Sequence, residues 1–121
     1  MKQCLIVDDS RVVRKVARKI LEGMNFTIDE AEDGVGALEI CRRKMPDAIL
    51  VDWNMPTMSG IEFLRVLRRE PSGANPIVVF CTSEHDLAQI TEAMEAGANE
   101  YITKPFDKEL MEATFAQAGL T

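Results

Sequence analysis

Five polar side chains that could act together follow separate apolar runs of the sequence. Asp8 and Asp9 come after the first of these runs, Asp52 closes the third, Thr82 closes the fourth, and Lys104 follows the fifth. Clustered carboxylates repel one another, and the single ammonium of Lys104 would leave negative charge in excess. A hard divalent cation would balance this excess, and Mg²⁺ suits a site made of a few carboxylates and water.

A Mg²⁺ ion beside an aspartate favours a phosphoryl group as the remaining partner. An aspartate can act as a nucleophile and form an aspartyl phosphate, and phosphoryl transfer mainly requires positioning and neutralisation of oxygen charge. Each residue also has an ordinary interpretation. Asp9 or Ser10 could cap a helix, a Lys-Pro pair is typical of a turn, and an aspartate at a strand end is usually solvated. The phosphoryl chemistry is favoured when all of these residues reach one place.

The rest of the sequence alternates between short apolar runs and longer amphipathic stretches. The apolar runs cover residues 4–7, 27–31, 48–51, 77–81 and 100–103, and spacing typical of helices lies between them and after the last. In the first helical stretch, one apolar stripe consists of Val12, Val13, Val16, Ala17, Ile20 and Leu21. Five repeats of strand and helix predict an α/β fold, with a five-stranded parallel sheet covered by helices on both faces.

The predicted sheet would gather the polar side chains at one edge. The carboxyl ends of parallel strands lie along the same edge, where ligand crevices form. Four strands would therefore bring three carboxylates, the hydroxyl of Thr82 and the ammonium of Lys104 together. The sequence thus predicts a metal-assisted phosphoryl site at this edge of the sheet.

The composition fits one folded domain over residues 1–121. The chain has 121 residues, of which 46% are hydrophobic and 28% charged, and a formal net charge of -6. These values exclude disordered classes and argue against a dedicated nucleic-acid-binding protein. The apolar runs are too short for a signal peptide or a membrane span, so we expect a cytoplasmic protein without membrane insertion. No two cysteines have metal-binding spacing, and we expect buried thiols at Cys4, Cys41 and Cys81.

The same residues resemble the receiver domain of two-component response regulators over essentially the whole chain. The resemblance implies a flavodoxin-like fold with the strand order 2-1-3-4-5 of CheY-like receivers. The matching motifs, in chain order, are Asp8-Asp9, Val51-Asp52-Trp53-Asn54-Met55-Pro56, Gly60, Thr82-Ser83 and Lys104-Pro105-Phe106.

The resemblance implies a role for each residue at the sheet edge. Asp52 is the expected phosphoacceptor, and the expected Mg²⁺ ligands are Asp8, Asp9, Asp52 and the backbone carbonyl of Asn54. Lys104 would pair with a phosphoryl oxygen as a compact point charge, and the Lys104–Pro105 peptide bond is expected to be cis. Because phosphorylation and dephosphorylation concern only Asp52 itself, we expect a signalling protein and not an enzyme that acts on other substrates.

The resemblance also implies a conformational switch. Thr82 would move toward a phosphoryl group on Asp52, and Tyr101 would turn into the space behind Thr82. A strand aromatic that simply packs is the alternative interpretation of Tyr101. The change would reach the surface on which family members bind target proteins, formed by the helix around 87–94, the strand at 100–103 and the helix around 110–115.

Two further positions flank the expected phosphorylation site. Asn54 and Glu84 match the variable positions that tune dephosphorylation in receivers, and both are polar. Both could orient an attacking water, so we expect a short-lived phosphoryl group.

The first helix carries charge of mainly one sign. Residues 11–22 hold five cations and one anion, whereas residues 84–112 hold eight acids and two lysines. In receivers the first helix lies beside the phosphorylation site and docks phosphodonor helices. We therefore expect a basic docking surface for a histidine kinase or histidine phosphotransferase, consisting of Arg11, Arg14, Lys15 and Arg18. A solvated, charged helix face without a partner is the alternative.

These features predict a stand-alone, CheY-like response regulator of a phosphorelay, with Mg²⁺ as cofactor and chemotaxis or motility as its pathway. A relay or phosphate-sink receiver in stress or developmental signalling is the alternative within the family. A phosphatase of the haloacid dehalogenase type also uses an aspartate at a strand end. That family requires a second aspartate two residues later, where this chain has Asn54.

Overall fold

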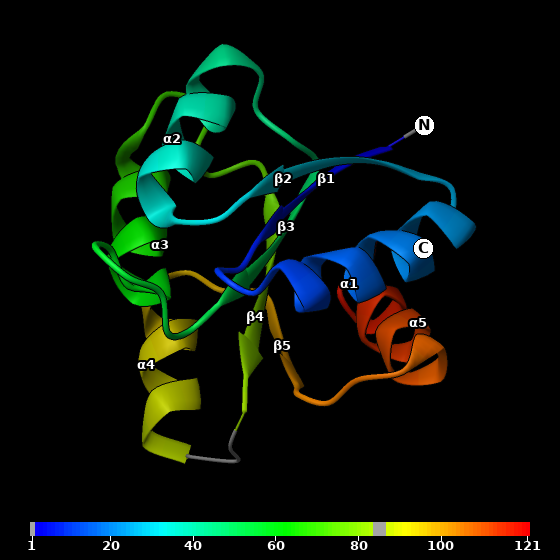
Figure 1. Ribbon diagram of the computed structural model, residues 1–121. Helices are drawn as coiled ribbons and strands as arrows, with labels where there is room; N and C mark the ends of the chain where they lie inside the picture. The colour runs from blue at the N-terminus through cyan, green and yellow to red at the C-terminus, as the bar shows by residue number, and fades with distance from the viewer. Residues whose placement is uncertain (1, 84–86) are drawn as a thin grey trace.

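The computed structural model describes residues 2–83 and 87–121. Strands and helices alternate along these residues (Figure 1), which confirms the predicted pattern. The strands are β1 (Lys2–Val7), β2 (Phe26–Ala31), β3 (Ala48–Asp52), β4 (Ile77–Thr82) and β5 (Glu100–Thr103). The helices are α1 (Arg11–Gly23), α2 (Gly34–Arg43), α3 (Gly60–Arg69), α4 (Leu87–Ala96) and α5 (Lys108–Gln117).

All strand pairs in the sheet are parallel, and the strand order is β2-β1-β3-β4-β5. This is the flavodoxin-like order that the sequence resemblance implied. Every residue of the central strand β3 is buried. Burial on both faces explains why this strand is a continuous apolar run without polar alternation.

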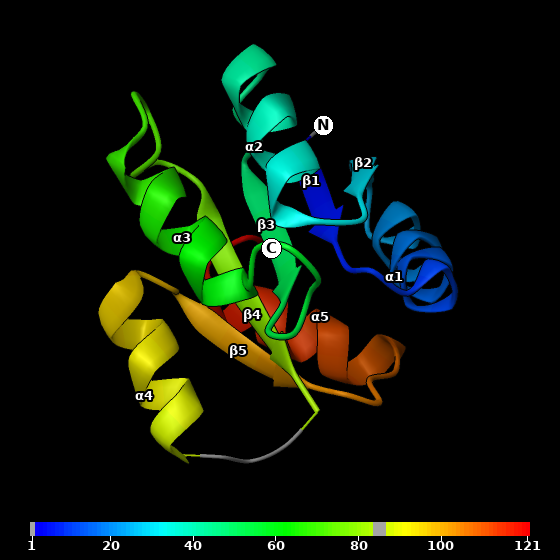
Figure 2. The same ribbon diagram turned by 60° about the vertical axis from the view of Figure 1, so that its left-hand side comes forward.

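Side chains that alternate along the strands pack into two separate cores. Leu5 and Val7 of β1 lie in the core covered by α2, α3 and α4. Cys4 and Ile6 of the same strand lie in the core covered by α1 and α5. Figures 1 and 2 show these two groups of helices on opposite sides of the sheet. The predicted layers, with helices on both faces, are therefore confirmed.

Short polar side chains fix where four of the helices begin. Each accepts a hydrogen bond from a backbone N–H of the first helical turn, which otherwise has no intrahelical partner. Ser59 and Glu62 form a reciprocal capping box at the start of α3. The capping residues are Ser10 for α1, Asp33 for α2, Ser59 for α3 and Asp107 for α5.

The predicted apolar stripe of α1 is only partly buried. Ala17 and Leu21 are fully buried, but the side chains of Val12 and Val16 are 72% and 45% exposed. Val12 and Val16 lie on the flank of α1 that lines an open groove, together with Phe106, instead of facing the sheet.

The cysteine prediction is confirmed, because Cys4, Cys41 and Cys81 are free thiols and all are buried. Burial raises the pKa of Cys4 and of Cys81 to about 12, so both thiols stay protonated at neutral pH.

Among the helices that the structure describes, none is both long enough and apolar enough to cross a membrane.

Candidate functional site

The register of the strands brings the predicted polar residues to one edge of the sheet. Val7, which precedes Asp8, lies opposite Val51, which precedes Asp52. Asp52 in turn lies opposite Cys81, next to Thr82. Thr82 lies opposite Thr103, which precedes Lys104. Adjacent strands thus end at nearly the same level, and the residue that follows each strand enters a shared site.

Three carboxylates meet at this edge. One oxygen from each of Asp8, Asp9 and Asp52 lies within 4.8 Å of the others. Asp8 and Asp52 are buried, at 3% and 8% exposure, whereas Asp9 is exposed. In the part of the chain that the structure describes, this is the one group of acidic, histidine or cysteine side chains that could hold a metal ion.

Lys104 contacts two of the three carboxylates. Its Nζ lies 2.8 Å from Asp8 Oδ2 and 3.1 Å from Asp52 Oδ1. The backbone places it there, because Lys104 N–H donates to the carbonyl of Thr82 over 2.8 Å. The Lys104–Pro105 peptide bond that follows is cis.

The cluster raises the pKa of both Asp52 and Lys104, which disfavours the charged form of Asp52 and favours that of Lys104. Burial, followed by the negative charge of Asp8, raises the pKa of Asp52, although Lys104 lowers it. Burial alone would lower the pKa of Lys104, but the hydrogen bond to Asp8 and the charges of Asp52 and Asp8 outweigh this effect and raise it. Lys104 therefore stays a cation, and Asp52 is a more basic carboxylate than an exposed aspartate.

In the turn between β1 and α1, one residue caps the helix and two others belong to the acidic cluster. Ser10, not Asp9, caps α1, because its hydroxyl accepts from Val13 N–H over 3.3 Å. Asp8 Oδ1 accepts from Ser10 N–H over 2.8 Å, which leaves its other oxygen for Lys104. The ordinary interpretation of this motif as a helix cap therefore applies to Ser10 and leaves both aspartates to the site.

The start of α3 packs directly against the backbone of Asp52. Gly60 N–H donates to the carbonyl of Trp53 over 3.0 Å. A Cβ at Gly60 would lie only 2.1 Å from the carbonyl oxygen of Asp52 and 2.9 Å from Phe80 Cζ. A glycine is thus required here for close approach of the helix to the strand end.

Thr82 connects the acidic cluster to the gap between β5 and α4. Its hydroxyl donates to Gln89 Oε1 of α4 at 3.5 Å, a long hydrogen bond. Thr82 and Gln89 both line a polar cavity of about 80 Å³ beside Asp52. Both also line a small apolar space of about 10 Å³ on the other side, together with Tyr101. The predicted switch pair, Thr82 and Tyr101, therefore borders one common space.

The structure describes one of the two positions that were expected to tune dephosphorylation. Asn54 is exposed and lines the polar cavity beside Asp52. Glu84 lies outside the described residues.

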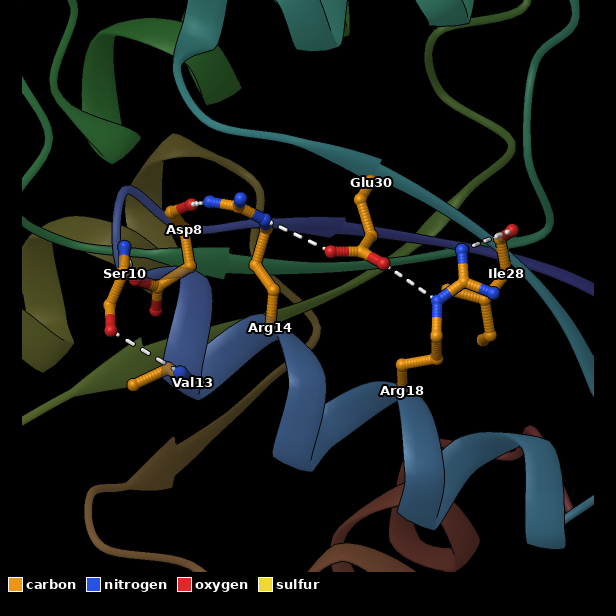
Figure 3. A network of polar contacts seen from close by, with 7 residues as sticks. All are labelled: Asp8, Ser10, Val13, Arg14, Arg18, Ile28 and Glu30. Atoms are coloured by element: carbon orange, nitrogen blue, oxygen red, sulfur yellow. Dashed lines mark hydrogen bonds and ion pairs between the residues drawn. The ribbon is translucent and has the colours of Figure 1, made fainter.

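The predicted basic surface on α1 contains two kinds of residue. Arg11 and Lys15 are exposed, whereas the side chain of Arg14 is only 14% exposed. Arg14 and Arg18 both form ion pairs with Glu30 of β2, at 3.0 Å and 2.6 Å (Figure 3). Arg14 also donates to the backbone carbonyl of Asp8 over 2.7 Å.

The sequence interpretation did not identify Glu30 or Gln89. Glu30 lies on a strand that is distant in sequence from α1, and Gln89 has an ordinary helical context, so neither had a motif that could have revealed it.

The chemistry of the cluster fits Mg²⁺. Asp8, Asp9 and Asp52 supply hard oxygen ligands, and the exposure of Asp9 leaves an open side for water and a phosphoryl group. Three carboxylates against the single ammonium of Lys104 also retain the excess negative charge that a divalent cation would neutralise.

Comparison with known proteins gives a consistent match. A family model described as the response regulator receiver domain matches residues 4–116. The chemotaxis protein CheY of Halobacterium salinarum is 41% identical over 107 residues, which cover 88% of each protein. The chemotaxis protein CheY of Pseudomonas aeruginosa is 38% identical over 108 residues, covering 88% of this chain and 87% of that protein.

Solved structures agree with these sequence matches. The chemotaxis response regulator CheY4 of Vibrio cholerae superimposes with a TM-score of 0.93 at 29% identity, over 98% of each chain. The receiver domain of a sensor histidine kinase from Pseudomonas aeruginosa, which has a magnesium ion coordinated in its active-site cleft, superimposes with a TM-score of 0.86 at 26% identity. That match also covers 98% of each chain.

Proposed function

The chain belongs to the response regulator receiver family, and from this premise we propose that it is a stand-alone, chemotaxis-type response regulator phosphorylated on Asp52. The donor is a histidine kinase or a histidine phosphotransferase. The observation that carries the proposal is the contact of Lys104 with both Asp8 and Asp52 in a buried cluster of carboxylates. The match to chemotaxis proteins over 88% and 87% of their own lengths supports a receiver of the chemotaxis type.

In this proposal Asp52 is the nucleophile. One of its carboxylate oxygens attacks the phosphorus, a new O–P bond forms, and the bond from phosphorus to the donor breaks, with the electron pair leaving on the donor. Mg²⁺, held by Asp8, Asp9, Asp52 and the backbone carbonyl of Asn54, supplies positive charge to the phosphoryl oxygens when it is bound. Burial keeps Asp52 poorly solvated and therefore reactive.

Lys104 and Thr82 act on the phosphoryl oxygens after transfer. Lys104 is already positioned by Asp8 at 2.8 Å, so it can release Asp52 and pair with a phosphoryl oxygen without leaving the site. Thr82 exchanges its long hydrogen bond to Gln89 for one to the same group. Tyr101 then turns into the space that Thr82 vacates.

The movement of Thr82 and Tyr101 changes the surface formed by α4, β5 and α5, which binds the downstream target. Three large apolar side chains on its two helices support this role, because they are exposed without a partner from the described residues to cover them. They are Leu87 at 76%, Met94 at 40% and Leu110 at 38% exposure.

The phosphodonor docks on α1. Arg11 and Lys15 are exposed and line a hollow that shares Val12 with an apolar groove of about 320 Å³. Val12, Val16 and Phe106 are among the residues that line this groove. An apolar groove with a basic border suits an amphipathic helix that carries acidic side chains. Arg14 and Arg18 contribute less to docking than the sequence interpretation proposed, because Glu30 engages both.

Asn54 and Glu84 set the rate of hydrolysis of the phosphoryl group. The side chain of Asn54 faces the polar cavity in which a water molecule would approach Asp52. We propose a phosphorylated form that decays within minutes rather than many hours at neutral pH.

The direct test is incubation with acetyl phosphate and Mg²⁺, followed by mass spectrometry of the intact protein and of its peptides. We expect the mass of one phosphoryl group on Asp52. This mass should be absent when EDTA is present during the incubation, and it should be absent in Asp52→Asn. Labelling at another residue, or of Asp52→Asn to the same extent, would overturn the proposal.

Two alternatives give different results in further assays. Sustained turnover of a generic phosphate ester would indicate a phosphatase, and the family match favours the receiver over this possibility. Rapid onward transfer from Asp52 to a histidine phosphotransferase, with no target captured by the activated form, would indicate a relay or phosphate-sink receiver.

A further inference from the structure

The peptide between Asp8 and Asp9 is held by a side chain of α1. Arg14 Nη1 donates to the carbonyl oxygen of Asp8 over 2.7 Å, and Arg14 Nε donates to Glu30 Oε1 over 3.0 Å (Figure 3). One guanidinium thus joins the turn after β1 to the neighbouring strand β2. The planar guanidinium can make both contacts at once, which a single ammonium cannot do in the same geometry.

Glu30 is a firm anchor for this guanidinium. It lies opposite Ile6 in the register of β1 and β2, so its backbone is fixed by the sheet. Burial alone would raise the pKa of Glu30, but Arg18 and Arg14 outweigh this effect and lower it, which keeps Glu30 ionised. Arg18 holds the other carboxylate oxygen at 2.6 Å.

Asp9 depends on its backbone for its position. Within residues 2–83 and 87–121 its carboxylate has no hydrogen-bond partner, and it is the exposed member of the acidic cluster. The carbonyl that Arg14 holds belongs to the peptide that joins Asp8 to Asp9, so its orientation sets the direction of the Asp9 side chain. Loss of this contact would free the peptide to rotate.

We infer that Arg14 is a positioning residue that orients the Asp8–Asp9 peptide for Mg²⁺ binding, with Glu30 as its anchor. The inference rests on the proposed function, because it concerns the same metal site. It differs from a docking role for Arg14, which would require an exposed guanidinium, whereas this side chain is 14% exposed. Groups that orient metal ligands from outside the ligand set commonly change metal affinity by about tenfold or more when removed.

The test is titration of the unphosphorylated protein with MgCl₂, without a phosphodonor. Trp53 is the only tryptophan of the chain and follows Asp52, so its fluorescence reports the site. In Arg14→Gln we expect the Kd for Mg²⁺ to rise about tenfold. The matched control is Arg18→Gln, which also removes an ion pair between α1 and Glu30 but no contact with Asp8. Its Kd should change by less than about twofold.

Two further measurements separate positioning from a general loss of structure. The melting temperatures of the two variants without Mg²⁺ should be similar, because each variant loses one ion pair with Glu30 and one hydrogen bond to a backbone carbonyl, which belongs to Asp8 for Arg14 and to Ile28 for Arg18. Arg18→Gln also loses an exposed ion pair with Glu22, which contributes little. At saturating Mg²⁺, Arg14→Gln should regain nearly the wild-type rate of phosphorylation by acetyl phosphate. Arg14→Lys keeps the positive charge but cannot contact both Glu30 and the Asp8 carbonyl, so its Kd for Mg²⁺ should rise as well. This variant tests the inference if Arg14→Gln does not fold.

Equal Mg²⁺ affinity in the Arg14 and Arg18 variants would overturn the inference while leaving the proposed function intact. A wild-type protein that neither binds Mg²⁺ nor accepts a phosphoryl group on Asp52 would overturn the proposed function and, with it, the inference. The wild-type titration therefore distinguishes the two failures.

Discussion

Lys104 and Asp52 form an ion pair of 3.1 Å, so the proposed phosphoacceptor is already in contact with the cation that would bind its phosphoryl group. Lys104 also holds Asp8 at 2.8 Å, so a protein cation and an incoming metal would share the same carboxylates. Two like charges near one site oppose each other. The ammonium of Lys104 should therefore weaken Mg²⁺ binding, even though both cations would stabilise the proposed phosphorylated state.

Replacement of Lys104 by methionine should reveal this competition. Removal of one positive charge from the partly buried cluster should lower the Kd for Mg²⁺ by roughly threefold to tenfold. Lys108→Met is the matched control, because it removes the same side chain from an exposed position on α5. Titration followed by Trp53 fluorescence measures both. Weaker Mg²⁺ binding in Lys104→Met would show that Lys104 organises the site more than it repels the metal.

Asp52→Asn should stabilise the protein at neutral pH when no metal is present. Burial and the charge of Asp8 raise the pKa of Asp52 in the folded state. A group whose pKa is raised by folding contributes stability while it is protonated, and that contribution is lost as the pH rises through its folded pKa. At pH 7 the ionised Asp52 is therefore a cost, which the asparagine removes while Lys104 keeps its contact with Asp8.

Thermal denaturation in EDTA across pH measures this effect. Because asparagine places no ionised group at this buried position, Asp52→Asn should melt a few degrees above the wild type at pH 7. The difference should shrink as the pH falls through the pKa of Asp52 and reach its minimum below about pH 4. Added Mg²⁺ should raise the melting temperature of the wild type and not that of the variant. A difference that does not depend on pH would contradict the electrostatic explanation.

Gly60→Ala should damage both stability and phosphorylation. Its Cβ would lie 2.1 Å from the carbonyl oxygen of Asp52, so either α3 or the end of β3 must move. We expect the free energy of unfolding to fall by about 2 kcal/mol and the rate of phosphorylation by acetyl phosphate to fall with it. Gly23→Ala is the control, because a Cβ there meets no atom within 4 Å. That variant should be within about 1 kcal/mol of the wild type, and equal effects in urea denaturation would refute the close-contact argument.

The sequence was sufficient to predict the residues that meet at the sheet edge, for a simple geometric reason. Parallel strands of similar length place their carboxyl ends at one level, so Asp52, Thr82 and Lys104 could be grouped without any knowledge of side-chain conformation. The strand order itself came from the family resemblance, because periodicity does not specify which strands are neighbours.

The contacts that the sequence could not predict are made by side chains across elements. The contacts of Glu30 could not be predicted from the sequence, because its two arginine partners lie on α1 and any exposed acid would have fitted the local strand pattern. Periodicity placed Val12 and Val16 in the apolar stripe of α1, because it shows which side chains share a helix face and not how much of that face is buried. Both side chains are exposed and line the groove that Phe106 also lines.

Charge reversal on α1 tests the donor surface without disturbing the metal site. Arg11 and Lys15 are exposed, and no hydrogen bond or ion pair within the described part of the chain involves either side chain. In Arg11→Glu/Lys15→Glu, the rate of transfer from the cognate histidine kinase should fall about tenfold or more at low ionic strength, because steering of an acidic partner is lost. The rate with acetyl phosphate should not change, since a small donor needs no docking surface.

The matched control carries the same change in net charge on a different surface. Arg43 and Lys44 are exposed at the end of α2, on the opposite face of the sheet from α1. Arg43→Glu/Lys44→Glu should therefore transfer at close to the wild-type rate from the same kinase, which a phosphotransfer profile against the kinases of the source organism would identify. Rising salt should reduce the difference between the two double variants, because it screens charges that are more than about 10 Å apart. If both double variants slow transfer from the kinase equally, net charge and not a surface on α1 governs the encounter. If the α1 variant also reacts more slowly with acetyl phosphate, its effect lies in the phosphorylation site itself.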